Sequence, residues 1–136
     1  MTTIRNSSTF LRRVMIADAV GGAVASVALL AAAGPLGDML ALPPAILRYF
    51  ALALVPIVAF IAWLVTRAEM PRAAVWVLIA INGLWAVESI FLLFTGWIHP
   101  NLAGQVFIVA QALVVLGLAE LQFIGLRRIA PRAVAA

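Results

Sequence analysis

Four long apolar stretches, separated by short polar turns, constrain this chain more than any other feature. They cover residues 14–33, 46–66, 73–97 and 103–126. A helix of about 20 residues is about 30 Å long, which matches the hydrocarbon core of a bilayer. None of the four stretches has the polar face that a helix of a soluble protein shows at a 3.6-residue period. The sequence therefore predicts an all-α polytopic membrane protein, an up-and-down bundle of four transmembrane helices forming one domain over residues 1–136.

The composition agrees with this fold class and argues against several functions. Hydrophobic residues make up 66% of the chain and charged residues 10%, whereas soluble domains average about 45–50% and about 25%. The absence of cysteine excludes thiolate chemistry and Cys-ligated metals, and His99 is the single histidine. The sequence has no zinc-protease motif, nucleophile elbow or phosphate loop. We therefore expect a protein that is not an enzyme and carries no metal or other cofactor.

The basic residues are all arginine, and most fall on one side of the predicted bundle. That side carries eight of the nine, leaving only Arg48 opposite: Arg5, Arg12, Arg13, Arg67, Arg72, Arg127, Arg128 and Arg132. Because cytoplasmic loops are enriched in Arg and Lys, we expect an inner (plasma) membrane protein with both termini in the cytoplasm. Arginines scattered over short segments form no folded basic surface, so nucleic acid is not an expected partner, whereas membrane lipids are.

Polar side chains inside a bilayer are costly, so they are the candidate functional residues. Asn82, Trp85, Glu88 and Ser89 fall within one arc of the predicted third helix, about half of its circumference. Gln111 on the fourth helix lies at the depth of Glu88, and a hydrogen bond between them is expected if the two faces meet. The Glu88 carboxyl then either joins two helices or carries a proton or a cation.

Two further acidic residues lie closer to the arginine-rich side. Asp18 belongs to the first predicted helix and Glu120 to the fourth. Both are shallow by their position along the helix, so we expect them to reach the interface or to pair with neighbouring arginines.

One face of the first predicted helix carries small residues at spacings of three and four. Its members are Ala17, Gly21, Ala25 and Ala28, with Gly22 beside them. Small side chains let helix backbones approach closely, so this face is expected to pack against another helix. The neighbour belongs either to the same bundle or to a second subunit.

These features favour a non-enzymatic membrane protein that acts through assembly or through binding of a lipid or another hydrophobic molecule. Assembly here means a homo-oligomer or an accessory subunit of a larger membrane complex. The alternative is a small proton- or cation-coupled transporter or channel that uses Glu88.

Overall fold

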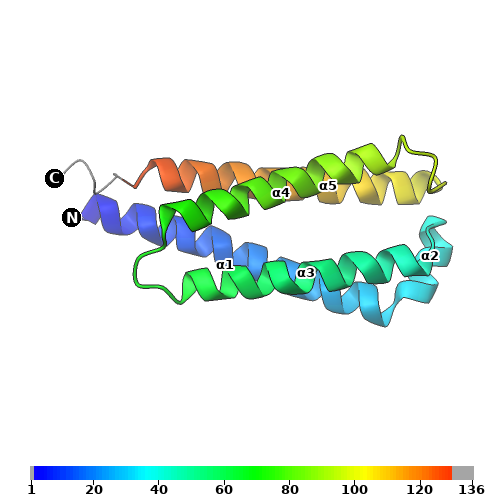
Figure 1. Cartoon of the computed structure of the whole chain (residues 1–136), viewed down its shortest axis with the longest axis horizontal. Coiled ribbons are helices and arrows are strands. Elements are labelled where there is room, and N and C mark those ends of the chain that lie inside the picture. Colours follow the sequence, from blue (N-terminus) through cyan, green and yellow to red (C-terminus); the bar gives the residue numbers. More distant parts are fainter. Residues whose placement is uncertain (1, 130–136) are drawn as a thin grey trace.

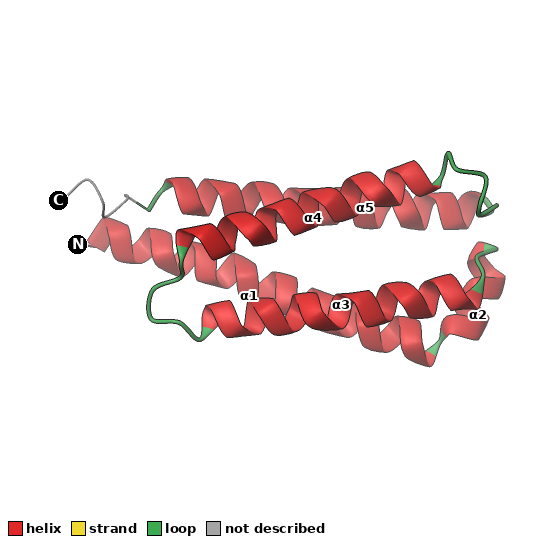
Figure 2. Cartoon of the chain, in the orientation of Figure 1, coloured by secondary structure: helices red, strands yellow, loops and turns green. Residues whose placement is uncertain are grey.

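The computed structural model is a helical bundle that describes residues 2–129, with side chains from Thr9 onward (Figure 1). Within this part of the chain the secondary structure is helix and loop, with no strand (Figure 2). Arg5 and Arg132 lie outside the described side chains. The helices are α1 (Thr2–Ala31), α2 (Ala33–Leu40), α3 (Pro44–Val65), α4 (Arg72–Leu92) and α5 (Leu102–Arg127).

The predicted fold class is confirmed. Four helical segments are long and apolar enough to cross a membrane, and they correspond to the four predicted stretches. These segments are Thr9–Ala31, Pro44–Val65, Arg72–Leu92 and Leu102–Arg127. Pro44 begins α3, at a position where the missing proline amide would have no helical partner in any case.

The third membrane helix is shorter than predicted. We expected it to reach residue 97, but α4 ends at Leu92. The following amides make tight turns, in which the Phe94 N–H donates to the Phe91 carbonyl and the Thr95 N–H to the Leu92 carbonyl. Gly96 then adopts φ 78°, a left-handed conformation that favours glycine. The shortening brings Glu88 closer to the end of its helix than predicted.

A short helix, α2, lies in the connection between the first two predicted stretches, where we expected a turn. The backbone breaks at Ala32, with φ −120° and ψ 25°, and enters α2 at the next residue. Pro35 lies in the first turn of α2, where a helix tolerates a missing amide. Ala41 ends the helix in the left-handed region, with φ 54°.

Asn101 and Gly104 attach α2 to the start of α5. The Asn101 side chain donates to the Met39 carbonyl at 2.9 Å, and its backbone N–H donates to the Leu40 carbonyl at 3.2 Å. Gly104 lies so close to the same Leu40 carbonyl that a Cβ would collide with it. Because α2 also packs on α3, it covers the end of the bundle opposite the arginine-rich end.

The long helices form two antiparallel pairs, α1 with α3 and α4 with α5 (Figure 1). The pairs meet most closely near the arginine-rich end, where α1 contacts α5. There a Cβ on Gly125 would lie 3.1 Å from the Cβ of Leu11. One apolar core lies at this end, around Leu11, Met15, Leu64 and Leu78, and a second lies near α2, around Leu29, Leu47, Ile98 and Ile108.

Two arginines cap helices at the arginine-rich end. Arg12 donates to the carbonyls of Val65 and Arg67, at the end of α3. Arg72 donates to the Leu126 carbonyl at 3.1 Å and to the Ile129 carbonyl at 2.9 Å, at the end of α5. The last carbonyls of a helix have no intrahelical donor, and a positive charge there is favourable. These two guanidinium groups therefore form hydrogen bonds with backbone carbonyls at helix ends rather than with side chains of the bundle interior.

Candidate functional site

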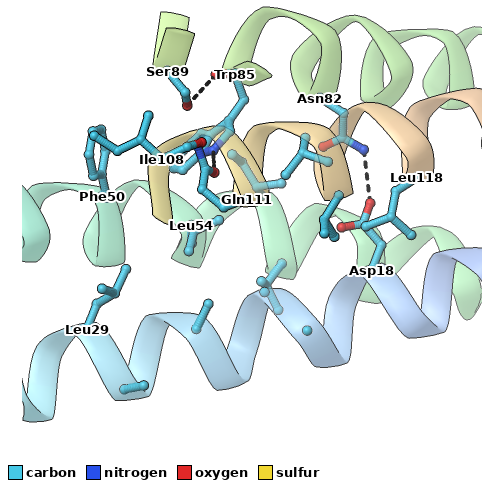
Figure 3. A pocket seen from close by; sticks show the side chains of 18 of the residues that line it. Asp18, Leu29, Phe50, Leu54, Asn82, Trp85, Ser89, Ile108, Gln111 and Leu118 are labelled. Atoms are coloured by element: carbon cyan, nitrogen blue, oxygen red, sulfur yellow. Dashed lines mark hydrogen bonds between the residues drawn. The ribbon is translucent and has the colours of Figure 1, made fainter. Parts of the chain in front are cut away.

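A cavity of about 370 Å³ lies between the two apolar cores. All four long helices contribute to its wall, and most of the lining side chains are apolar (Figure 3). Examples are Leu29, Leu54, Ile57, Val115 and Leu118. Small-molecule sites in proteins have volumes of about 300–1,000 Å³ and mostly apolar walls with a few polar groups. By size and lining, this cavity belongs to that class.

Small residues of α1 leave the space that the cavity occupies. Gly21, Gly22, Ala25 and Ala28 all belong to the wall, and a Cβ added to Gly21 would meet no atom within 4 Å. Only Gly22 is at a close contact, because its Cβ would lie 2.8 Å from Val58 of α3. The small-residue face therefore packs on a helix at one position and borders open space along most of its length.

The cavity opens to the surface of the bundle between α1 and α5. Its lining residues on α3 and α4 are buried or half-buried. By contrast, Gly21 and Ala28 of α1, and Phe107 and Val114 of α5, line the cavity and are exposed. Ala17, one helical turn before Gly21, is also exposed but does not line the cavity. The two helices diverge from the arginine-rich end towards α2 (Figure 1), which leaves this side unfilled.

At one end of the cavity Asp18, Asn82 and Gln122 form a hydrogen-bonded group, here called the three-helix cluster. Asn82 Nδ2 donates to Asp18 Oδ2 at 3.0 Å and to Gln122 Oε1 at 3.1 Å. Gln122 Nε2 donates to the same Asp18 oxygen at 2.7 Å. Asn82 and Gln122 are buried, and Asp18 is half-buried. The cluster ties α1, α4 and α5 together, and Figure 3 shows Asp18 and Asn82 facing each other.

Trp85, Ser89 and Gln111 form a second group further along the cavity, here called the two-helix cluster because it joins only α4 and α5. The Trp85 indole N–H donates to Gln111 Oε1 at 3.0 Å, and Gln111 Nε2 donates to the Ile108 carbonyl at 2.9 Å. The Ser89 hydroxyl donates to the Trp85 carbonyl at 2.7 Å (Figure 3). The Phe50 ring packs against the Trp85 ring in the cavity wall, with their centroids 5.7 Å apart.

The expected bond between Glu88 and Gln111 is not formed. Glu88 is exposed and lies outside the cavity wall, about 90° around the helix from the centre of the arc that holds Asn82, Trp85 and Ser89. It is also only four residues, about 6 Å along the axis, from the end of α4 at Leu92. The structure thus brings four of the five predicted residues, Asn82, Trp85, Ser89 and Gln111, to the cavity and leaves Glu88 outside.

Asp18 and Glu120 also differ from expectation. Neither pairs with an arginine among the described residues, and Glu120 is exposed on the outside of α5. Asp18 instead faces two amide side chains, because the nearby Arg12 binds the end of α3. Gln122 was absent from the predicted site. The sequence contains a pattern that could have identified it: Gln111 and Gln122 are eleven residues apart, about three helical turns, and so share one helix face.

Comparison with known proteins assigns the chain to no family. No family model matches it, and neither the curated proteins nor the solved structures give a match. No group of three or more His, Asp or Glu side chains within residues 9–129 is placed to hold a metal ion. We therefore infer function from the cavity and its polar groups.

Proposed function

We propose that this protein binds a small hydrophobic molecule or a lipid chain inside the membrane. The observation that carries the proposal is the apolar cavity of about 370 Å³, which opens between α1 and α5. In a protein that spans a bilayer, this opening meets lipid, so a hydrophobic molecule enters without crossing water. An unfilled apolar cavity lacks the dispersion contacts of a packed core, and a hydrocarbon occupant supplies them.

Quenching of Trp85 by a neutral brominated hydrocarbon tests the proposal. Trp85 is the one tryptophan in the cavity wall. Replacing Trp63, Trp76 and Trp97 by Phe gives a variant that is here called the Trp85-only protein. The protein is placed in lipid nanodiscs and titrated with 1-bromododecane. We expect quenching that saturates, whereas a variant that keeps only the exposed Trp97 reports unsaturable partitioning into lipid. Equal, unsaturable quenching of both tryptophans would contradict the proposal.

A pair of glycine substitutions supplies a matched control for the cavity. Gly21 and Gly83 both have open space where a Cβ would lie, but only Gly21 belongs to the cavity wall. We expect Gly21→Leu to abolish the saturable phase of Trp85 quenching. Gly83→Leu adds the same side chain to α4 and should leave that phase unchanged.

Assembly into a homo-oligomer or a larger membrane complex stays a prediction, as does a non-enzymatic role. Proton or cation transport through Glu88 also stays a prediction. We favour binding in the cavity over transport through Glu88 because that carboxyl lies on the outer face, near the end of α4. Sizing the protein in lipid nanodiscs at several dilutions tests assembly directly.

We also propose that the protein lies in the inner (plasma) membrane, with its arginine-rich end facing the cytoplasm. The chain has no cysteine, so single cysteines report the side of each loop. Ala68 and His99 are exposed in turns at opposite ends of the bundle. In intact cells we expect a membrane-impermeant maleimide to label His99→Cys and to label Ala68→Cys only after permeabilisation. The reverse labelling pattern would show that the arginine-rich end lies on the outer side of the membrane and would contradict this orientation.

A further inference from the structure

The three-helix cluster presents hydrogen-bond acceptors to the cavity and keeps its donors for itself. Both N–H groups of Asn82 are used, one on Asp18 and one on Gln122. Gln122 is fully buried and outside the wall. By contrast, Asp18 Oδ1 and Asn82 Oδ1 accept no hydrogen bond within residues 9–129. Because no side-chain N or O atom of this part is both buried and unpaired, these two oxygens remain accessible.

The Asp18 carboxyl also has no cationic partner in the described part of the chain. Arg12 and Arg72, which are half-buried at the arginine-rich end, donate to helix-end carbonyls. The guanidinium groups of Arg67, Arg127 and Arg128 lie over aromatic rings at the surface. Two amide N–H groups stabilise a carboxylate without cancelling its charge. The cavity therefore has one end that is rich in acceptors and negative when Asp18 is ionised.

The rest of the wall suits a hydrocarbon or aromatic tail. Beyond the three-helix cluster the lining is aliphatic and aromatic, with Phe50, Trp85 and Phe107 among its members. In the two-helix cluster the Trp85 indole N–H, the Ser89 hydroxyl and one N–H of Gln111 are bound to Gln111 Oε1 and to backbone carbonyls, so a single N–H of Gln111 is left as a donor. Neither a carboxylate nor a phosphate head group finds a free cluster of donors here. An ammonium group brings both the positive charge and the N–H donors that the two free oxygens lack.

We propose that the cavity takes an amphiphilic amine, whose protonated head group donates to Asp18 Oδ1 and Asn82 Oδ1. The tail then lies along the apolar wall towards Phe50 and Phe107. This inference rests on the proposed function, because it assigns a polar end to the ligand of the same cavity.

Three ligands with one tail and different head groups test this inference. The Trp85-only protein, in nanodiscs of zwitterionic lipid, is titrated with 12-bromododecylamine, 12-bromododecanol and 12-bromododecanoate. We expect the amine to bind about tenfold more tightly than the alcohol, because a charge-assisted hydrogen bond is stronger than a neutral one. The carboxylate should bind most weakly. A carboxylate that binds as tightly as the amine would overturn the inference.

Asp18→Asn removes the charge and keeps an oxygen that accepts from both amides. We expect it to weaken amine binding about tenfold and to change alcohol binding less than twofold, so the alcohol doubles as the folding control. If Asp18→Asn does not fold, Asp18→Glu takes its place and should retain most of the amine preference. Glu120→Gln, which removes an exposed carboxyl outside the cavity, should change the affinity for neither the amine nor the alcohol.

The two proposals fail in different ways. If the alcohol binds saturably and Asp18→Asn leaves amine affinity unchanged, the amine assignment is wrong and hydrophobe binding stands. If neither the alcohol nor 1-bromododecane binds saturably, the proposed function itself is wrong.

Discussion

The two polar clusters of the cavity differ in how their members are connected and in what they leave unpaired. The three-helix cluster joins residues 64 and 104 positions apart in sequence, across α1, α4 and α5. The two-helix cluster joins residues 26 positions apart on the antiparallel pair α4 and α5. Asp18 and Asn82 keep free acceptors at the cavity, whereas Trp85 and Ser89 have their donors fully used.

We infer from this difference that the two clusters have different structural roles. A bond between neighbouring helices of one pair strengthens a contact that apolar packing already makes. A bond between pairs fixes the width of the space that separates them, because α1 packs mainly on α3 and α4 mainly on α5. We therefore regard the three-helix cluster as the group that sets the shape of the cavity. The two-helix cluster holds the Trp85 ring in its wall.

The largest effect on stability is expected for Asn82→Leu. This change removes both bonds that Asn82 donates and leaves Asp18 and Gln122 short of donors in a buried place. We expect a loss of about 2 kcal/mol in the free energy of unfolding. Reversible unfolding in mixed lipid and SDS micelles measures it. A loss below that of Gln111→Leu would contradict the ranking of the two clusters.

Gln111→Leu should have a smaller effect, because it breaks one interhelical bond within a packed pair. We expect about 1 kcal/mol, since the Trp85 indole N–H loses its acceptor. In the Trp85-only protein the emission maximum should shift to the blue, as the indole no longer donates a hydrogen bond. An unchanged emission spectrum would show that Trp85 does not donate to Gln111.

Glu88→Gln should have the smallest effect. Glu88 is exposed and has no hydrogen bond within residues 9–129, so the change in unfolding free energy should stay within about 0.5 kcal/mol. The same micelle titration measures it, with wild type as reference. A loss as large as that of Asn82→Leu would mean that Glu88 is paired, for instance with another subunit.

The sequence predicted the membrane helices well because hydropathy is a local property of each stretch. It also identified Asn82, Trp85, Ser89 and Gln111, since interior polar residues are rare enough to weigh one by one. It placed Glu88 wrongly because this side chain lies on the exposed face of the helix and because helix depth depends on where α4 ends. That end is set by tight turns after Leu92 and by the left-handed Gly96, neither of which hydropathy detects.

The partner of Asp18 was beyond sequence reasoning for a different reason. Arg12 lies six residues away on the same helix, and charge alone favours pairing the two. In the structure the unpaired carbonyls at the end of α3 take the guanidinium, and Asp18 turns to amides on α4 and α5. Small residues of α1 likewise predicted close packing, whereas the divergence of the helix pairs turns most of that face into a cavity wall.

The central claim, that the bundle holds a hydrophobic molecule in its middle, is tested most directly by paramagnetic broadening of the tryptophan indole resonances. The wild-type protein in nanodiscs is titrated with a neutral spin-labelled alkyl chain, and all four indole N–H signals are followed together. We predict that broadening of Trp85 saturates, while Trp63, Trp76 and Trp97, which are exposed, broaden in proportion to ligand in the lipid. Parallel, unsaturable broadening of all four signals would contradict the account.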